Sequence, residues 1–283
     1  MRFGFFGINI GPCADPEVLA SVTRHLEDAG FDSVWTGEHV VLPDPQAPPS
    51  PSPPHVPFLD PAVALTWAAA HSERLRLATG IVILPQRNPL VLAKEIASLD
   101  VLSGGRAILG IGAGYLQPEF RALGVPFAGR GHRTDEAIDA LRALWNLENP
   151  AFDGDTVSFA GVDAHPRPVQ PGGVPIVVGG TSPGALRRAV SRGHGWYGFA
   201  LTPEATAPVL EGLRKAAGEV ERPPALGELE ITVTPPPGLD AEGVLRFTAL
   251  GVDRLVLLAG ARDVAGIHGF VGAAARDLLA VAP

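Results

Sequence analysis

Short apolar runs alternate with longer amphipathic runs along the whole chain. The short runs predict strands at Phe3–Ile8, Ser33–Gly37, Leu75–Leu84, Ala107–Gly112, Pro175–Val178, Trp196–Phe199, Leu229–Thr234 and Arg254–Leu258. The longer runs predict helices at Pro16–Ala29, Pro61–His71, Pro89–Leu102, Thr134–Leu147, Pro183–Arg192, Pro203–Ala217, Asp240–Leu250 and Val264–Val281. This alternation is typical of βαβ units, which build parallel sheets.

Four of the predicted helices start with the same capping motif, a polar residue followed by proline. The polar side chain can accept a hydrogen bond from a free backbone N–H, and the fixed φ of proline suits the first helical position. The four pairs are Asp15-Pro16, Asp60-Pro61, Ser182-Pro183 and Thr202-Pro203.

The eight strand–helix pairs favour an α/β fold built as one closed (β/α)8 barrel, a TIM barrel, with residues 1–283 as a single domain. A doubly wound open sheet is the alternative. The stretch Glu148–Pro168 breaks the alternation, because Thr156–Phe159 within it alternates polar and apolar residues. We interpret it as a small hairpin inserted between the fourth helix and the fifth strand.

Composition and charge narrow the class of protein. The 283 residues are 46% hydrophobic and carry a formal net charge of -8, which argues against nucleic acid or an anionic membrane as the main partner. The one cysteine, Cys13, excludes an internal disulfide, and a reducing cytoplasm is the simplest location. We find no apolar run of about 18 residues and no cleavage site after Met1–Ile10, so we expect neither a membrane span nor a signal peptide.

The segment Pro43–Pro57 contains eight prolines, a composition that favours an extended polyproline conformation and cannot pack a core. We expect a surface loop here, and a lid over the substrate is the alternative.

Three loops that follow predicted strands carry candidate chemistry. After the second strand, Glu38 and His39 place a carboxylate beside an imidazole, and the carboxylate can hold the tautomer of the imidazole. After the fourth strand, the glycines of Gly110–Gly114 would let a flat ligand approach the backbone. After the fifth strand, Gly179–Pro183 leads into a helix N-terminus, which favours an anion such as phosphate. Capping and tight packing are the structural alternatives at these loops.

The chain lacks the sequence motifs of several other enzyme classes. The chain has no HExxH motif and no cluster of histidines and carboxylates in the sequence that would predict a metal site, and it has no GxSxG motif of serine hydrolases. Its two lysines, Lys94 and Lys215, lie inside predicted helices, so Schiff-base chemistry at a strand end is not expected.

An ordered set of short motifs along the chain resembles the bacterial luciferase-like monooxygenase superfamily. The motifs are Gly30–Trp35, Glu38-His39, Ala78–Pro85, Arg87–Leu90, Ser98–Asp100, Ser103–Arg106, Gly110–Gly112, Arg130-Gly131, Asp135-Glu136, Leu141–Trp145 and Val178–Gly180. The resemblance extends over essentially the whole chain and is strongest to the oxidoreductases that use the deazaflavin coenzyme F420.

The resemblance implies a barrel that binds a flavin or deazaflavin at its C-terminal face. A non-proline cis peptide at Gly80-Ile81 would support the ring, and glycines elsewhere would flank it or hold the phosphate. The implied cofactor-binding residues are Thr79, Gly80, Ile81, Gly112, Ala113, Gly114, Val178, Gly179, Gly180 and Thr181. His39 would face the substrate, with Glu38 contacting the cofactor or fixing His39. Tyr115 stands where some relatives carry a glutamate that donates a proton, so His39 or Tyr115 would deliver it here.

The leading hypothesis is therefore an oxidoreductase that transfers a hydride between coenzyme F420 and a small organic substrate. One alternative is an FMN-dependent monooxygenase that uses reduced flavin and oxygen and needs a separate reductase. Another is a non-catalytic flavin-binding barrel. The resemblance also implies a homodimer, whereas no metal, nucleic acid or membrane partner is expected. The substrate is not readable from these residues.

Overall fold

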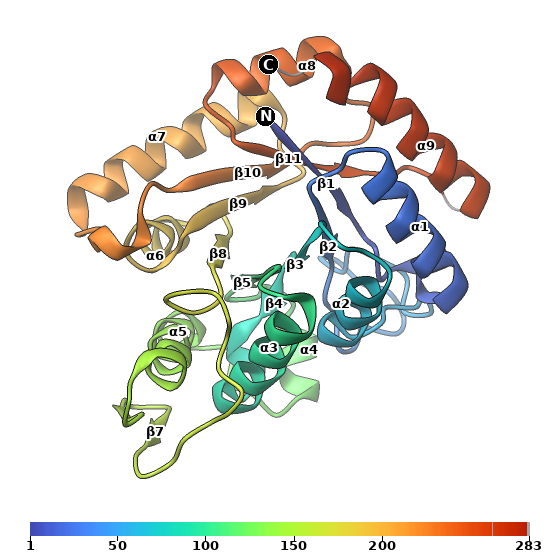
Figure 1. The fold of residues 1–283 in the computed structure, drawn as a ribbon. Helices are drawn as coiled ribbons and strands as arrows, with labels where there is room; N and C mark the ends of the chain where they lie inside the picture. The colour runs from blue at the N-terminus through green and yellow to red at the C-terminus, as the bar shows by residue number, and fades with distance from the viewer. Residues whose placement is uncertain (262, 282–283) are drawn as a thin grey trace.

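The strands of the parallel sheet follow one another around a ring, and β3 pairs with β5 to close it (Figure 1). The computed structural model describes residues 1–261 and 263–281. The barrel strands are β1 (Arg2–Phe6), β2 (Ser33–Thr36), β3 (Arg76–Thr79), β4 (Val82–Ile83), β5 (Ala107–Gly112), β8 (Ile176–Gly179), β9 (Gly195–Phe199), β10 (Glu230–Thr234) and β11 (Arg254–Leu258). The predicted (β/α)8 barrel is confirmed, and the open-sheet alternative is excluded.

Helices surround the barrel on its outside (Figure 1). They are α1 (Pro16–Asp28), α2 (Pro61–Ala70), α3 (Pro89–Ser103), α4 (Gln117–Ala122), α5 (Arg130–Asn146), α6 (Pro183–Arg192), α7 (Pro203–Glu219), α8 (Ala241–Ala249) and α9 (Val264–Asp277). The predicted caps are confirmed, since Asp15, Asp60, Ser182 and Thr202 each accept a hydrogen bond from a backbone N–H of the first turn. These caps satisfy donors that the helix itself leaves free.

The third barrel strand differs from its prediction. Instead of one strand over Leu75–Leu84, β3 ends at Thr79 and β4 begins at Val82, and both pair with β5. The Gly80-Ile81 peptide between them is cis, as the resemblance implies. The two residues form a bulge that faces the end of β5.

The other differences between the predicted and the observed elements lie in the connection from β5 to β8. The predicted hairpin is present as β6 (Phe152–Asp153) and β7 (Ser158–Phe159), which pair antiparallel after α5. The sequence did not predict α4, and α5 begins at Arg130 rather than Thr134. α4 was missed because six residues without a capping side chain carry no clear periodic pattern. The proline-rich segment 43–57 forms turns and bends and is largely exposed.

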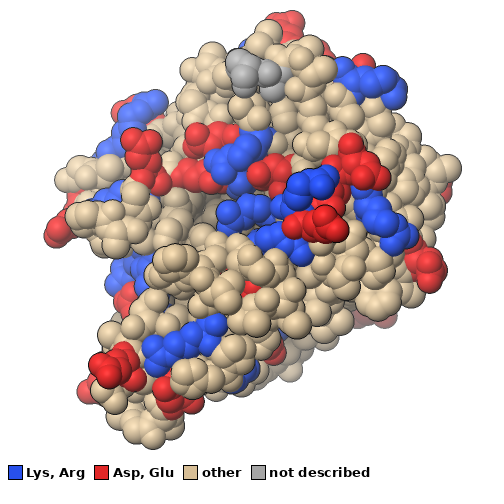
Figure 2. Space-filling model, viewed as in Figure 1, with Lys and Arg blue, Asp and Glu red and all other residues tan. Residues whose placement is uncertain are grey.

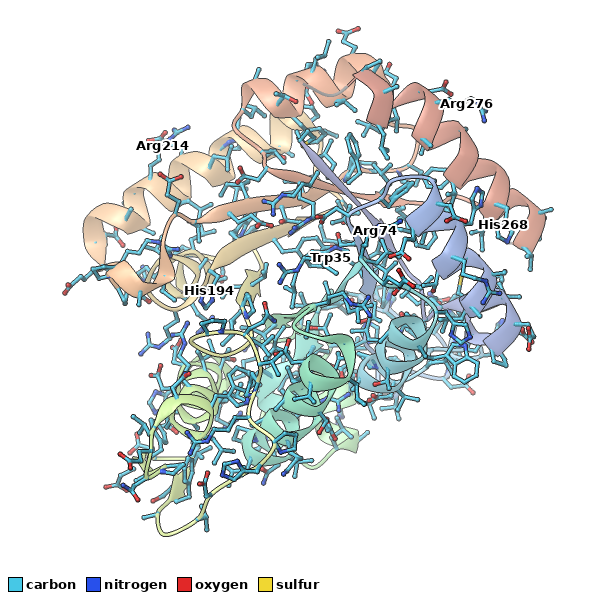
Figure 3. The ribbon with its side chains drawn as sticks, viewed as in Figure 1. Trp35, Arg74, His194, Arg214, His268 and Arg276 are labelled. Carbon is cyan, nitrogen blue, oxygen red and sulfur yellow. The ribbon has the colours of Figure 1, made fainter. Side chains whose placement is uncertain are left out.

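The core has two parts. Apolar side chains between the strands and the helices form the larger part, whereas a smaller cluster fills the interior of the barrel. In that interior Trp35 stacks on Tyr197 with 5.1 Å between the ring centroids, and Figure 3 shows Trp35 at the middle of the barrel. The barrel is therefore a packed core rather than a pore, as is usual for this fold.

Basic and acidic side chains are interleaved on the face that Figure 2 shows. Some of the pairs lie where the strands begin: Arg254 Nε donates to Asp32 at 2.8 Å, and Arg2 lies 2.8 Å from Glu230. Arg254 is 1% exposed and its carboxylate partners are partly exposed, so ion pairs around a buried guanidinium close this end of the barrel.

By length and composition, Val264–Val281 is the one helical stretch among the described residues that could span a membrane, whereas the sequence predicted none. Ile267, Val271 and Ala274 of this stretch are buried in the core, and Phe270 contacts Phe5 of β1 at 6.4 Å between ring centroids. This is the packing of an outer barrel helix.

Candidate active site

The loops at the C-terminal ends of the strands meet at one mouth of the barrel, because all the strands run in parallel. Glu38 and His39 follow β2, Tyr115 follows β5, and the turn that begins at Gly180 follows β8. Tyr115 contacts His39 across the first two of these loops, and Glu38 accepts from Ile83 of β4 and from Arg87 after β4. The fold therefore places the sequence-predicted residues of these loops at the same end of the barrel.

His39 occupies the centre of the network. Its Nδ1 atom lies 3.2 Å from Oε2 of Glu119, and its Nε2 atom lies 3.5 Å from the Tyr115 hydroxyl. The imidazole side chain is only 8% exposed. Phe58 and Tyr115 present their rings to it edge on, at 6.0 and 6.1 Å between centroids. The imidazole is thus held on both ring nitrogens, and one of these contacts is to a half-exposed phenol.

Glu119 is the functional candidate that sequence reasoning missed. It lies in α4, its residue is 1% exposed, and its Oε1 atom accepts a hydrogen bond from Val40 N at 2.7 Å. The only signal in the sequence is an acidic residue four positions after Tyr115. That signal is weak, because the contact with His39 spans 80 residues of chain.

Of the two roles that the resemblance implied for Glu38, the structure contradicts the fixing of His39. Its Oε2 atom accepts from Ile83 N at 2.5 Å, and its Oε1 atom accepts from Arg87 Nε at 2.9 Å. Burial raises the pKa of the Glu38 carboxyl, whereas the Arg87 charge opposes the shift. The carboxylate that contacts His39 Nδ1 is that of Glu119. Glu38 therefore ties the loop after β2 to the segment after the bulge, and it does not fix His39.

Arg87 is fully engaged in this arrangement. Besides Glu38 it pairs with Asp60 at 2.8 Å, and Glu95 lies 3.7 Å away. Burial alone would lower the pKa of Arg87, but the Glu38 and Asp60 charges raise it above its ordinary value. This guanidinium is therefore a neutralised structural cation rather than a free anchor for an anionic substrate.

The glycines at the end of β5 make room for the bulge. A Cβ atom on Gly112 would overlap the Ile81 side chain, and one on Gly114 would lie 2.6 Å from Ile83 Cγ2. On the neighbouring strand β8, a Cβ on Gly179 would lie 3.2 Å from Ile81 Cδ1. The bulge and these glycines form one tightly packed wall with little side-chain bulk. Ala113 lies between Gly112 and Gly114 and is partly exposed.

Two of the predicted cofactor residues serve packing through their side chains. The Thr79 hydroxyl is buried and donates to the Gly110 carbonyl oxygen at 2.6 Å. Val178 is 0% exposed and belongs to the core between the strands and the helices.

The turn after β8 has the features expected of an anion site. Gly180 adopts a φ of +108°, and a Cβ there would lie 3.3 Å from the Ala185 Cβ. Gly180 and Thr181 are exposed, and Ser182 caps α6 through the Ala185 N–H. Trp196 Nε1 fixes the turn by donating to the Gly180 carbonyl oxygen at 2.8 Å. The positive end of the 10-residue helix α6 therefore faces outward at the mouth.

Near the start of α5, the structure brings together a set of ligand-type side chains that the sequence did not reveal. His132 Nε2 lies 3.1 Å from Glu136 and 3.0 Å from Asp155. The Glu136 carboxylate also accepts from the backbone N–H groups of Asp155 and Thr156. These bonds account for the cluster as the anchor that holds the β6–β7 hairpin on α5.

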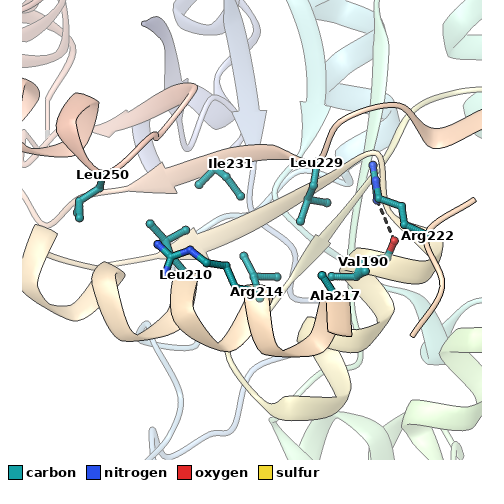
Figure 4. Close-up of a pocket in the computed structure, with 9 residues that line it drawn as sticks. Val190, Leu210, Arg214, Ala217, Arg222, Leu229, Ile231 and Leu250 are labelled. Atoms are coloured by element: carbon teal, nitrogen blue, oxygen red, sulfur yellow. Dashed lines mark hydrogen bonds between the residues drawn. The ribbon is translucent and has the colours of Figure 1, made fainter. Parts of the chain in front are cut away.

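A cavity of about 290 Å³ lies outside the barrel wall, against α6, α7 and β10 (Figure 4). Apolar side chains line most of it, and Arg222 at its rim donates to the Val190 carbonyl oxygen at 2.8 Å. Leu229 and Ile231 place it where β10 begins, at the opposite end of the strand from the mouth. It is therefore separate from the candidate site.

The comparisons with known proteins agree with this architecture. The family model for luciferase-like monooxygenases matches residues 5–241. An uncharacterised Mycobacterium tuberculosis protein is 32% identical over 248 residues, covering 84% of this chain and 85% of that protein. The F420-dependent glucose-6-phosphate dehydrogenase of Kineococcus radiotolerans is 33% identical over 229 residues, covering 77% of this chain and 63% of that enzyme.

Two solved structures share the fold. An F420-dependent secondary alcohol dehydrogenase superposes with a TM-score of 0.80 at 18% identity, covering 100% of this chain and 99% of that one. The Streptomyces bottropensis monooxygenase RslO1 superposes with a TM-score of 0.76 at 23% identity, covering 99% of both chains. The chain belongs to the luciferase-like monooxygenase family and is an oxidoreductase of that family.

Proposed function

We propose that this enzyme transfers a hydride between coenzyme F420 and a neutral organic alcohol or carbonyl compound, with His39 as the acid or base. The observation that carries the proposal is the buried His39 between Glu119 and Tyr115 at the mouth of the barrel. A positioned imidazole suits a reaction in which a hydroxyl proton must leave or return.

The mouth fits a cofactor of this class. The exposed Gly180-Thr181 turn and the N-terminus of α6 would hold its phosphate, and the glycine-lined wall beside Ile81 would lie against its ring. When bound, the deazaflavin would supply the carbon that accepts or donates the hydride. These residues would bind and orient it.

The protein's own part in the reaction is proton transfer. His39 Nε2 takes the hydroxyl proton while an alcohol is oxidised, and it returns that proton while a carbonyl is reduced. Burial and the nearby Glu119 charge raise the pKa of the Tyr115 phenol, so Tyr115 stays protonated and serves as a hydrogen-bond donor. General acid–base catalysis of this kind contributes about 10²–10⁴-fold to rates.

Side chains at the C-terminal ends of the strands favour an uncharged substrate with an apolar flank. Tyr115 is 49% exposed, and Phe199, which packs on Phe6 at 4.9 Å, is 48% exposed at the end of β9. The Arg87 charge is neutralised by Glu38 and Asp60. We therefore expect no turnover of glucose-6-phosphate, despite the 33% identity to a dehydrogenase with that substrate.

The FMN-dependent monooxygenase is the second candidate, because the family model is named for that reaction and RslO1 shares the fold. Paired fluorescence titrations of the purified protein with F420 and with FMN separate the two. Tight binding of F420 alone supports hydride transfer, and a panel of neutral alcohols and ketones then tests turnover.

Preference for FMN, together with oxygen consumption coupled to reduced FMN, would overturn the proposal and make a partner reductase the next question. Binding of neither cofactor would leave a barrel without this chemistry. We also propose a homodimer, and a light-scattering mass equal to one chain would contradict it.

A further inference from the structure

We propose that Glu119 is the positioning residue that sets the tautomer of His39, so that Nδ1 carries the proton and Nε2 offers its lone pair to the mouth. The tautomer is inferred from the hydrogen bonds around Glu119. Its catalytic consequence rests on the function proposed above.

The argument starts from the two oxygens of Glu119. A carboxylate only accepts hydrogen bonds, and Oε1 already accepts from the backbone N–H of Val40 at 2.7 Å. Oε2 faces His39 Nδ1 at 3.2 Å. Because neither oxygen can donate, the bond is made only when Nδ1 carries a hydrogen.

Burial makes this preference strong. The side chain of Glu119 is 0% exposed and that of His39 is 8% exposed, so water does not compete for either group. An unpaired buried polar atom loses its hydrogen bond to water without a replacement, which is unfavourable. The alternative tautomer would set the Nδ1 lone pair against a carboxylate oxygen, which the fold cannot relieve by solvation.

The bond between Glu119 and His39 Nδ1 also determines which form of Nε2 is presented at the mouth of the barrel. With the hydrogen on Nδ1, the Nε2 atom is an acceptor directed at the Tyr115 hydroxyl, 3.5 Å away. A substrate hydroxyl that replaces this contact would find a base there. Glu119 thus prepares His39 to take a proton without touching the substrate itself.

The test is Glu119→Gln, which has nearly the same shape but cannot keep both bonds. The Val40 N–H is a fixed backbone donor, so the amide oxygen must face it, and the amide NH2 group then faces His39 Nδ1. An NH2 group donates, so Nδ1 must become the acceptor and the hydrogen must move to Nε2. Imidazole ¹⁵N spectra distinguish the two neutral tautomers without any substrate.

We expect the His39 signals, assigned by their loss in His39→Ala, to show the Nδ1–H form in the natural protein and the Nε2–H form in Glu119→Gln. Turnover should fall on the order of 100-fold, while the KM and the cofactor affinity stay within about threefold. In a Ser-His-Asp enzyme, the equivalent carboxylate-to-amide change costs about 10⁴-fold through the wrong tautomer.

The chain offers a matched control. Glu136 is also a buried glutamate that contacts a histidine, His132 at 3.1 Å, and accepts from backbone N–H groups. Glu136→Gln should leave the His39 signals and turnover unchanged. Equal losses of turnover in both variants would mean that the effect is general destabilisation, and the positioning role would be wrong.

The remaining outcomes separate this inference from the proposed function. The Nε2–H form of His39 in the natural protein would overturn the positioning role, even if Glu119→Gln fails to fold. Full turnover in Glu119→Gln, with His39→Ala inactive, would also overturn it. Full turnover in His39→Ala would instead overturn the proposed acid–base function, while the spectra would still decide the tautomer.

Discussion

The two ends of the barrel use charged residues in opposite ways. Where the strands begin, Arg254 is 1% exposed and is paired with Asp32 and Glu230. Its charge is therefore neutralised within the fold. At the mouth where the strands end, His39 is held by Glu119 on one nitrogen and directed at exposed Tyr115 by the other. Closed pairs stabilise the barrel, whereas a half-open network leaves a group free to react.

The comparison predicts that substitutions at the two ends separate activity from stability. Substitutions at the mouth should lower activity with little loss of stability. Substitutions where the strands begin should lower stability and leave the chemistry of the folded fraction unchanged.

The largest effect is expected for His39→Ala. Turnover should fall about 10²–10⁴-fold, the usual contribution of a general acid or base, while the affinity for the cofactor stays unchanged. Steady-state kinetics and fluorescence titration measure the two quantities, and His132→Ala is the matched control on an exposed histidine. Unchanged turnover would remove His39 from the mechanism.

Arg254→Met tests the opposite end. It leaves Asp32 without this partner and Glu230 with the Arg2 ion pair. Because the Asp32 and Glu230 side chains are 25% and 26% exposed, we expect a loss of about 2 kcal/mol of unfolding free energy, below the full cost of breaking a buried ion pair. Denaturant unfolding should show that loss, with turnover per folded molecule unchanged. Arg192→Met breaks the half-exposed pair with Asp139 and should cost less than about 1 kcal/mol. Similar losses in the two variants would contradict the distinction between buried and surface pairs.

His194, which precedes β9, makes stability depend on pH at the same end of the barrel (Figure 3). Burial and the charges of Arg142 and Arg222 lower its pKa to about 4, whereas the unfolded value is near 6.5. Its Nδ1 atom accepts from Ile176 N at 3.0 Å, which requires an unprotonated nitrogen.

Because the unfolded chain takes up the proton first, stability is fully present above about pH 6.5 and falls as the pH drops toward 4. Allowing for partial solvent screening, the loss is about 2 kcal/mol. His194→Asn should flatten this part of the pH profile of the melting temperature. A profile as steep as that of the natural protein would show that other groups dominate.

The smallest of these effects is expected for Gly180→Asp. The new carboxylate would repel a phosphate at the N-terminus of α6, and the φ of +108° disfavours any side chain there. We expect about tenfold weaker cofactor binding, a change of about 1.4 kcal/mol. Gly172→Asp, at an exposed position with a φ of +80°, controls for backbone strain, and equal binding by the two variants would place the phosphate elsewhere.

Prediction from sequence succeeded where the signal is local. The strand Ala107–Gly112 and the helix Pro183–Arg192 have their predicted bounds, because apolar spacing and caps act within a few residues. It failed at the third strand, where one continuous apolar run forms two strands, β3 and β4, and at α4, which is too short to show helical periodicity. Glu38 was assigned beside His39 because the two are adjacent in sequence, although their side chains have different partners.

The sequence by itself determined the alternation of strands and helices and the loops at which His39 and Gly180 lie. The pairing of β3 with β5 decided for a closed barrel over an open sheet. Only the tertiary structure decided the bonding partners: Glu119 for His39 across 80 residues, Arg87 for Glu38 across 49, and Ile81 packed where side chains on Gly112 and Gly179 would otherwise stand. The physical reason is that hydrophobic spacing and capping depend on neighbouring residues. Hydrogen bonds and close packing at the mouth depend on how the closed barrel brings distant loops together.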